Sequence, residues 1–276
     1  MRRDALRGVL SVATNLVGVA AFAWPFLLPG LPGGRAHATD APFVLAVLIS
    51  LLGGLLFAEL GRGGLGPKAV ALIGVLGAAM VALRLPGFVA GFSPMFLVVL
   101  LAGNAFGPGF GFTLGAIGTL ASGLFVGGLG PWLPFQMVAI GWVGAGAGLV
   151  GRARSWPRRL GGLALYAFVT GYLFGALMNL WAWPFLALSG GIGYDPGASL
   201  VGNLRAYAAY YAATSFVWDS ARAIGDALVV VLAGRPLLGA LDRAARRMRL
   251  SVEPNAVELQ GSLPRPVAAR ARGAGL

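Results

Sequence analysis

Three ionisable side chains lie close together in an otherwise apolar segment, and their spacing could support chemistry. Asp219 and Arg222 are three residues apart, and Asp226 follows four residues after Arg222. Side chains at these spacings share one helical face, so Arg222 can pair with either carboxylate. A charge inside a membrane costs about 2.5–3.5 kcal/mol on insertion scales, so such groups are functional candidates by default. They could serve proton- or ion-coupled transport, or form a structural ion pair, which their partial charge balance favours.

A second group combines aromatic rings with two amides at the ends of apolar segments. Its members follow the Gly130-Pro131 pair, end the apolar segment before residue 188, or begin the segment after residue 205. The usual interpretation is an aromatic belt at the membrane interface. The alternative is the wall of a small-molecule pocket, where aromatic surfaces and a few polar groups act together. The group consists of Trp132, Phe135, Gln136, Asn179, Trp181, Trp183, Tyr207 and Tyr211.

The composition indicates an all-helical integral membrane protein. Of the 276 residues, 58% are hydrophobic and only 11% are charged, which leaves too little polar surface for a soluble domain. The chain has no cysteine and one histidine, and it carries no phosphate-binding loop of the Gly-x-x-x-x-Gly-Lys-Ser/Thr type. We therefore expect no enzyme activity, catalytic residue, metal site or cofactor. The net charge of +12 suggests contacts with anionic lipid rather than with nucleic acid.

Hydrophobic segments long enough to cross a bilayer, at roughly 20 residues each, predict about eight spans. Gly107-Pro108 and Gly130-Pro131 divide one long apolar block into three of them, because Gly and Pro favour turns and helix starts. The predicted spans are residues 9–29, 42–60, 68–86, 92–106, 109–127, 134–151, 160–188 and 206–233. The first could instead be a signal peptide, since Ala21-Phe22-Ala23 is typical of a cleavage site.

The distribution of Arg and Lys predicts the orientation of these spans. Basic residues gather before the first span, between the second and third, between the sixth and seventh, and after the eighth. If eight spans alternate, all these positions lie on one side, which the positive-inside rule makes cytoplasmic. We therefore expect a multi-pass protein of the cell membrane with both termini in the cytoplasm.

Three regions differ in character along the chain. Residues 1–66 hold the first two spans, 67–235 form a six-helix core, and 236–276 combine a basic amphipathic helix, up to residue 250, with a disordered tail. In the third span Gly74, Ala78 and Ala82 recur every four residues and form a smooth stripe. Such a stripe allows close helix packing, either inside this protein or against a partner membrane protein.

The region from about Lys68 to Pro236 resembles the substrate-binding subunits (S-components) of energy-coupling factor (ECF) vitamin transporters. The resemblance rests on the order of several motifs, each weak by itself. The small-residue stripe comes first, followed by the Gly-Pro step at 107–108. The wording Gly-Pro-Trp-Leu-Pro-Phe-Gln-Met at 130–137 and Thr-Ser-Phe-Val-Trp-Asp-Ser-Ala-Arg-Ala at 214–223 is similar to an actinobacterial branch of the family.

This resemblance implies a non-catalytic subunit that captures a vitamin outside the cell and docks on a membrane-embedded coupling subunit joined to two ABC-type ATPases. Ala78 and Ala82 match the family's docking stripe, and Gly74 extends it. The aromatic and amide group would line the pocket, and its many rings suggest cobalamin, although riboflavin and thiamine precursors stay open. The two spans before residue 67 depart from the six-span pattern.

Two other functional classes remain possible on the sequence alone. One is a self-sufficient proton- or ion-coupled transporter that uses Asp219, Arg222 and Asp226. The other is a membrane assembly protein without a small ligand.

Overall fold

The structure is a computed structural model, and it describes most of the chain up to residue 250. The described residues are 2–27, 46–47, 49–51, 53–54, 67–85, 92–126, 128–153, 155–186, 188 and 191–250. Their regular secondary structure is entirely helical. The helices are α1 (Arg2–Leu27), α3 (Pro67–Arg84), α5 (Met95–Phe106), α6 (Pro108–Val126), α7 (Leu133–Leu149), α8 (Trp156–Ala182), the 3₁₀ turn η1 (Trp183–Phe185), α9 (Leu200–Thr214) and α10 (Phe216–Leu250).

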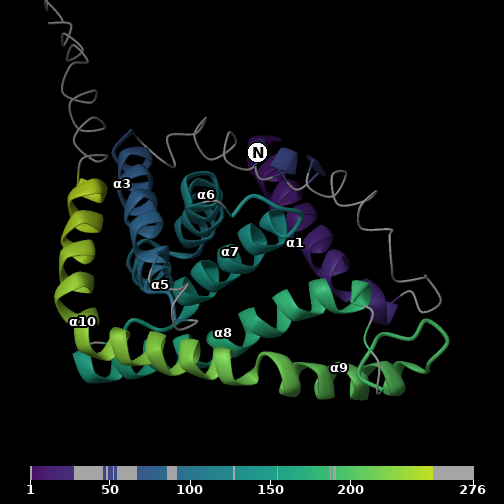
Figure 1. The fold of residues 1–276 in the computed structure, drawn as a ribbon. Helices are drawn as coiled ribbons and strands as arrows, with labels where there is room; N and C mark the ends of the chain where they lie inside the picture. Colours follow the sequence, from purple (N-terminus) through teal and green to yellow (C-terminus); the bar gives the residue numbers. More distant parts are fainter. Residues whose placement is uncertain are drawn as a thin grey trace, which may run out of the picture.

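The helices form a bundle around α5, and α1 packs on the side of the bundle where α7, α8 and α9 lie (Figure 1). Helix α8 runs beside α10, and α9 continues roughly along the line of α10 (Figure 1). Helix α10 changes direction toward its C-terminal part, and Pro236 lies inside it. A proline removes one helical hydrogen bond and crowds the preceding turn, which accounts for such a bend.

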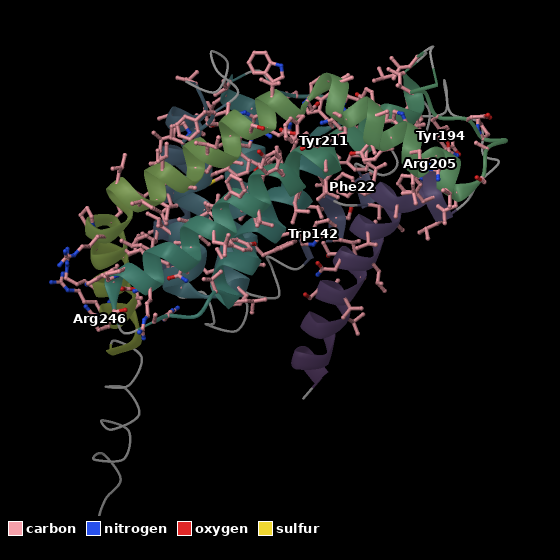
Figure 2. The ribbon with its side chains drawn as sticks, turned by 90° about the horizontal axis from the view of Figure 1, so that it is seen from below. Phe22, Trp142, Tyr194, Arg205, Tyr211 and Arg246 are labelled. Carbon is pink, nitrogen blue, oxygen red and sulfur yellow. The ribbon has the colours of Figure 1, made fainter. Side chains whose placement is uncertain are left out.

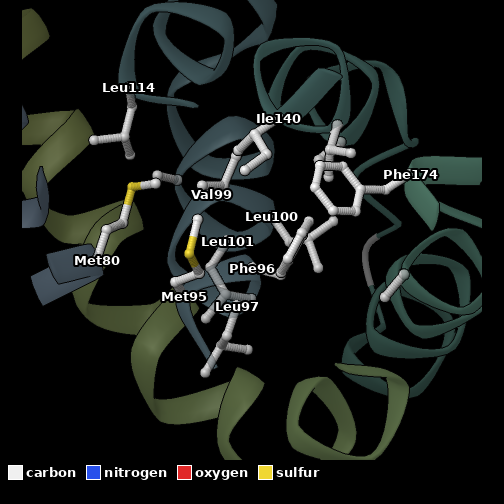
Figure 3. Close-up of a cluster of buried hydrophobic side chains, with 14 of the residues drawn as sticks. Met80, Met95, Phe96, Leu97, Val99, Leu100, Leu101, Leu114, Ile140 and Phe174 are labelled. Atoms are coloured by element: carbon white, nitrogen blue, oxygen red, sulfur yellow. The ribbon is translucent and has the colours of Figure 1, made fainter. Parts of the chain in front are cut away.

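The centre of the bundle is the short helix α5, which is almost entirely buried. Its 12 residues span about 18 Å, well below the roughly 30 Å of a bilayer core. Ten of the 12 residues are buried, because neighbouring helices surround this apolar sequence on all sides. Figure 3 shows Val99, Leu100 and Leu101 in the middle of the apolar cluster, with Met80 on one side and Phe174 on the other.

The predicted breaks at the two Gly-Pro pairs are confirmed. Gly107 separates α5 from α6 with a φ of 101°, a region that side chains other than Gly rarely adopt. Pro108 begins α6, where the missing amide proton costs no helical hydrogen bond. Helix α6 ends at Val126 and α7 begins at Leu133, so Gly130-Pro131 lies in the connection between them.

Three described helices are long and apolar enough to cross a membrane, which supports the membrane class but not a count of eight spans. They lie at 108–126, 156–185 and 216–248, and shorter apolar helices occur at 9–23, 95–106 and 133–149. The predicted span at 42–60 falls largely outside the described residues, and the predicted tail at 251–276 falls wholly outside them.

The last predicted span needs a correction. Residues 206–233 do not form one helix, because α9 ends at Thr214 and α10 begins at Phe216, with Ser215 between them. The predicted amphipathic segment after residue 235 is helical, but it continues α10 rather than forming a separate helix. Leu238 is fully buried in the apolar core, so this segment is part of the bundle.

Candidate functional site

Aromatic side chains from distant parts of the chain meet at one end of the bundle. In the first contact group, Trp132 and Trp181 lie edge to face with ring centroids 6.3 Å apart. Phe135 lies 5.8 Å from the same Trp181 ring and is buried. The connection between α6 and α7 holds Trp132, and the last turn of α8 holds Trp181. Rings at these separations attract one another beyond the burial of their surfaces.

A second contact group forms around Trp183, in the 3₁₀ turn that follows α8. Pro184 lies in this turn, and its missing amide proton accounts for the end of α8 just before it. The Trp183 ring lies 5.2 Å from Tyr207 and 5.5 Å from Tyr194, and it is fully buried. Its indole N–H donates to the carbonyl of Ile192 at 2.8 Å, so this loop is held against the ring. The Tyr207 hydroxyl donates to the carbonyl of Ala176.

The two groups and the surrounding residues make up what we call the aromatic end. It comprises Phe22, Phe26, Arg84, Ser122, Trp132, Phe135, Gln136, Asn179, Trp181, Trp183, Tyr194, Tyr207 and Tyr211. Burial and the neighbouring Asp195 carboxylate both raise the pKa of Tyr194 above its ordinary value, so its hydroxyl is neutral near pH 7.

Both amides of the predicted set are held by hydrogen bonds inside the protein. Gln136 accepts from Arg84 at 3.2 Å, and Arg84 also donates to the Ser122 hydroxyl at 2.8 Å. No carboxylate among the described residues pairs with this guanidinium. Asn179 accepts from Ser215 at 2.7 Å, which ties the end of α8 to the break between α9 and α10. The two amides are therefore oriented in advance.

Several residues of the aromatic end were not predicted from the sequence. Phe22 of α1 lies 5.4 Å from Phe135, and Phe26 lies 6.1 Å from Trp183. Phe22 and Phe26 are four residues apart and therefore share a helical face. This spacing is the signal that could have identified them. Arg84 is the last residue of α3, and no local pattern in the sequence connects it with Gln136.

Of the three ionisable residues singled out in the last apolar segment, Asp219 and Arg222 form an ion pair, and Asp226 takes no part in it. Arg222 donates to Asp219 on the same helix, and its guanidinium lies 5.2 Å from the centre of the Phe174 ring. The Asp219 carboxylate lies against Gly175 of α8, where a side chain would collide with it. Asp226 is buried, and its Oδ1 atom has no hydrogen-bond partner. The pairing predicted for Asp219 and Arg222 is present, while Arg222 makes no hydrogen bond to Asp226 among the described residues.

The small-residue stripe of α3 lies on the surface of the described structure. Gly74, Ala78 and Ala82 are all exposed, and a side chain added at Gly74 would meet nothing within 4 Å. The other face of α3 buries Ile73 and Met80 in the core. The stripe is therefore not used for helix packing among the described residues.

The opposite end of the bundle is polar and is held by arginines. Arg159 is buried, donates to Asn104 at 2.8 Å and forms a two-bond ion pair with Asp242 at 2.6 and 3.1 Å. Arg152 donates to the carbonyls of Asn104 and Ala105, both at 2.8 Å, where α5 ends. We call Asn104, Arg152, Arg159 and Asp242 the arginine end. Figure 2 shows Tyr194 and Arg246 at opposite extremes of the molecule.

This arrangement is suited to noncovalent binding. Aromatic rings with a few oriented polar groups can hold a flat, partly apolar molecule. The described residues contain no group of three or more His, Cys, Asp or Glu side chains that could hold a metal ion.

One comparison with known proteins identifies a family. The model described as "ECF transporter, substrate-specific component" matches residues 68–234, which is more than half of the chain. No significant match was found among curated proteins or among solved structures.

Proposed function

Because this chain belongs to the family of ECF transporter substrate-specific components, we propose that it captures a vitamin at the aromatic end and delivers it to an ATP-driven importer. The matched region, 68–234, contains α3 to α9 and the first part of α10. The chain is thus a substrate-binding membrane subunit of an ECF transporter. The identity of the vitamin and the way in which the subunit couples to its partners are the proposed parts.

The observation that carries the proposal is the meeting of Trp132, Phe135 and Trp181 with Trp183 and Tyr207. These rings come from the α6–α7 connection, α7, α8, η1 and α9, and they all lie at one end. An aromatic belt would only need rings at the lipid surface. Phe135 and Trp183 are instead buried, which argues against a belt and makes them the support for the partly exposed rings of Trp132, Trp181 and Tyr207.

For the substrate we propose a corrinoid of the cobalamin type. A large, flat macrocycle offers the broad apolar faces that several rings can contact, while its amide groups suit Gln136 and Asn179. Arg84, which has no acidic partner among the described residues, suits an anionic group on the substrate.

The test is to purify the full chain in mild detergent from cells grown on rich medium and to record the absorption and mass spectra of what co-elutes. A corrinoid spectrum is the expected result. A flavin or a thiamine-like mass would keep the vitamin-binding function and overturn the corrinoid proposal. A protein that elutes empty and binds none of cyanocobalamin, riboflavin, thiamine and biotin would overturn the proposed function.

For coupling, we propose that the exposed stripe of Gly74, Ala78 and Ala82 docks on a membrane-embedded coupling subunit joined to two ABC-type ATPases. Small side chains let a partner helix approach closely, and a bulky side chain there prevents it. We propose that the arginine end and both termini lie in the cytoplasm, as the positive-inside rule predicts.

Docking is tested by co-purification with the coupling subunit. Ala78→Trp and Ala82→Trp should abolish co-purification while the affinity for the vitamin stays unchanged. Leu165→Trp is the matched control, because Leu165 is an exposed apolar residue of α8 away from the stripe. If both stripe variants still co-purify, the docking surface lies elsewhere.

One observation favours a second candidate function, transport coupled to an ion or a proton without ATPases. The buried Asp226 carboxylate has an oxygen without a hydrogen-bond partner, which a bound proton would satisfy. Uptake by the purified chain alone in liposomes, lost in Asp226→Asn, would establish this function. Absence of uptake without the ATPases would exclude it.

A further inference from the structure

We propose that α1, which precedes the family core, is a fixed wall of the substrate site: Phe26 contacts the bound substrate, and Phe22 holds the Phe135 ring in position. This inference rests on the proposed function, because it concerns the same site. Helix α1 ends at Leu27, whereas the family match begins at residue 68. Part of the substrate recognition would then come from outside the region that defines the family.

The first step is the position of Phe22 among residues of the aromatic end. Its ring lies edge to face with Phe135 at 5.4 Å and tilted against Trp142 at 6.0 Å. Phe22 is buried, and it belongs to the same apolar core cluster as Phe135. Figure 2 shows Phe22 and Trp142 where α1 meets the rest of the bundle. Phe22 therefore packs against the first aromatic contact group through Phe135, its residue from α7.

The second step is that Phe26, one helical turn further on, reaches the other contact group. Its ring lies 6.1 Å from Trp183 and 6.2 Å from Tyr207, edge to face with the latter. Residues four apart share a helical face, so Phe22 and Phe26 together span both groups. Phe26 and Tyr207 are both only partly buried, so each keeps some exposed surface. A molecule bound beside Tyr207 would therefore also meet this face of α1.

The third step is the contact between α1 and α7, one to two helical turns before Phe22. The Trp142 indole N–H donates to the Asn15 side chain at 2.5 Å. A side chain at Gly18 would come within 2.8 Å of Val138, so α1 and α7 are in close contact there. The far side of α1 carries Val9, Val12 and Leu16, which are all more than half exposed, as suits a lipid-facing surface. A hydrogen bond, a close helix crossing and two aromatic anchors favour a fixed wall over a mobile lid.

The first experiment compares the two faces of α1 in the full chain. Cyanocobalamin, riboflavin, thiamine and biotin are titrated in turn, and the dissociation constant is measured for each vitamin that the unchanged protein binds. Phe22→Ala and Phe26→Ala should each weaken binding by about tenfold, the range expected when one aromatic contact is lost. Val12→Ala and Leu16→Ala on the lipid-facing side should leave the dissociation constant unchanged.

The outcomes separate this inference from the proposed function. If the unchanged protein binds a vitamin and both Phe variants bind it equally well, α1 is not part of the site, and the proposed function stands. If the unchanged protein binds none of the four, both the function and the inference fail. Unfolding temperatures of the variants distinguish a lost contact from a misfolded protein, and Phe26→Leu, which keeps an apolar side chain, should restore part of the affinity.

A second experiment distinguishes a wall from a lid. The chain has no cysteine, so Gly18→Cys combined with Val138→Cys introduces a single possible disulfide between α1 and α7. The oxidised protein should bind the same vitamin with the same dissociation constant as the reduced protein. Loss of binding on oxidation, restored by dithiothreitol, would show that α1 moves away to admit the substrate and would overturn the fixed wall.

Discussion

The arginine end and the aromatic end of the bundle differ in how their polar groups are used. At the arginine end, the Arg159 guanidinium donates to Asn104 and Asp242, and Arg152 caps the carbonyls at the end of α5. At the aromatic end, rings meet edge to face, and Arg84 donates only to the neutral Gln136 and Ser122 side chains among the described residues. A fully hydrogen-bonded ion pair stabilises one arrangement, whereas a guanidinium without a carboxylate leaves a charge that an anionic group of a substrate could bind.

From this difference we expect stability to depend mainly on the arginine end and vitamin binding mainly on the aromatic end. Substitutions at the arginine end should lower the free energy of unfolding and leave vitamin affinity unchanged in the protein that still folds. Substitutions at the aromatic end should lower affinity with smaller effects on unfolding. Substitutions at four positions test this separation of stability from binding.

The largest expected effect is at Arg159. Arg159→Ala leaves Asp242 and the side-chain oxygen of Asn104 without their partner, and breaking a buried ion pair costs about 3–5 kcal/mol of unfolding free energy. The measurement is thermal unfolding in detergent. Arg158→Ala is the control, because the neighbouring Arg158 is exposed, and it should change the unfolding temperature little. Equal effects of the two substitutions would contradict the role of the ion pair.

The next effect concerns the contact between α8 and α10. In Gly175→Ala the new methyl group collides with the Asp219 carboxylate, so we expect a loss of about 1–3 kcal/mol from overpacking. Gly161→Ala on the same helix meets nothing within 4 Å and should leave stability unchanged or raise it. Denaturation of both variants in the same detergent is the measurement, and the prediction fails if Gly175→Ala is as stable as Gly161→Ala.

At the aromatic end, Trp132→Ala should weaken vitamin binding by about tenfold because one aromatic face is lost. The unfolding temperature should change less than in Arg159→Ala. Equilibrium binding measures the effect, with Trp218→Ala as the control, because Trp218 is an exposed residue of α10. An unchanged affinity in Trp132→Ala would move the pocket away from this ring.

The smallest effect is expected for Gln136→Ala. It removes one amide and leaves Arg84 with its second hydrogen bond to Ser122, so affinity should fall by about fivefold, the value of one neutral hydrogen bond. Gln136→Glu provides the contrast, since a carboxylate would pair with Arg84 and compete with any anionic group of the substrate. A tighter-binding Gln136→Glu protein would argue against such an anionic group.

Local signals in the sequence were sufficient for several parts of the fold. The Gly107-Pro108 break depends on backbone angles that only a few residue types adopt, so neighbouring residues decide it. The pairing of Asp219 with Arg222 also lies within one helix, where spacing alone brings the side chains together. The division at Ser215 was missed because Thr214-Ser215 contains neither Gly nor Pro, the residues that mark the other breaks.

Contacts between distant helices could not be predicted in the same way. The meeting of Phe22 with Phe135 and of Arg84 with Gln136 joins segments that share no local pattern. Likewise, the segment after Pro236 has a basic, amphipathic composition typical of a surface helix, yet Leu238 and Asp242 connect it to the core. Such contacts depend on how helices are arranged, which composition does not specify.

Local sequence patterns were therefore enough to predict an all-helical membrane protein, its Gly-Pro breaks and a resemblance to the S-components of ECF transporters. The burial of α5, the exposure of the α3 stripe and the contact of α1 with the aromatic end are seen only in the packed helices. The physical reason is that nearly every face of a membrane helix is apolar. Hydropathy then identifies the helices but not which face meets a neighbour and which meets lipid.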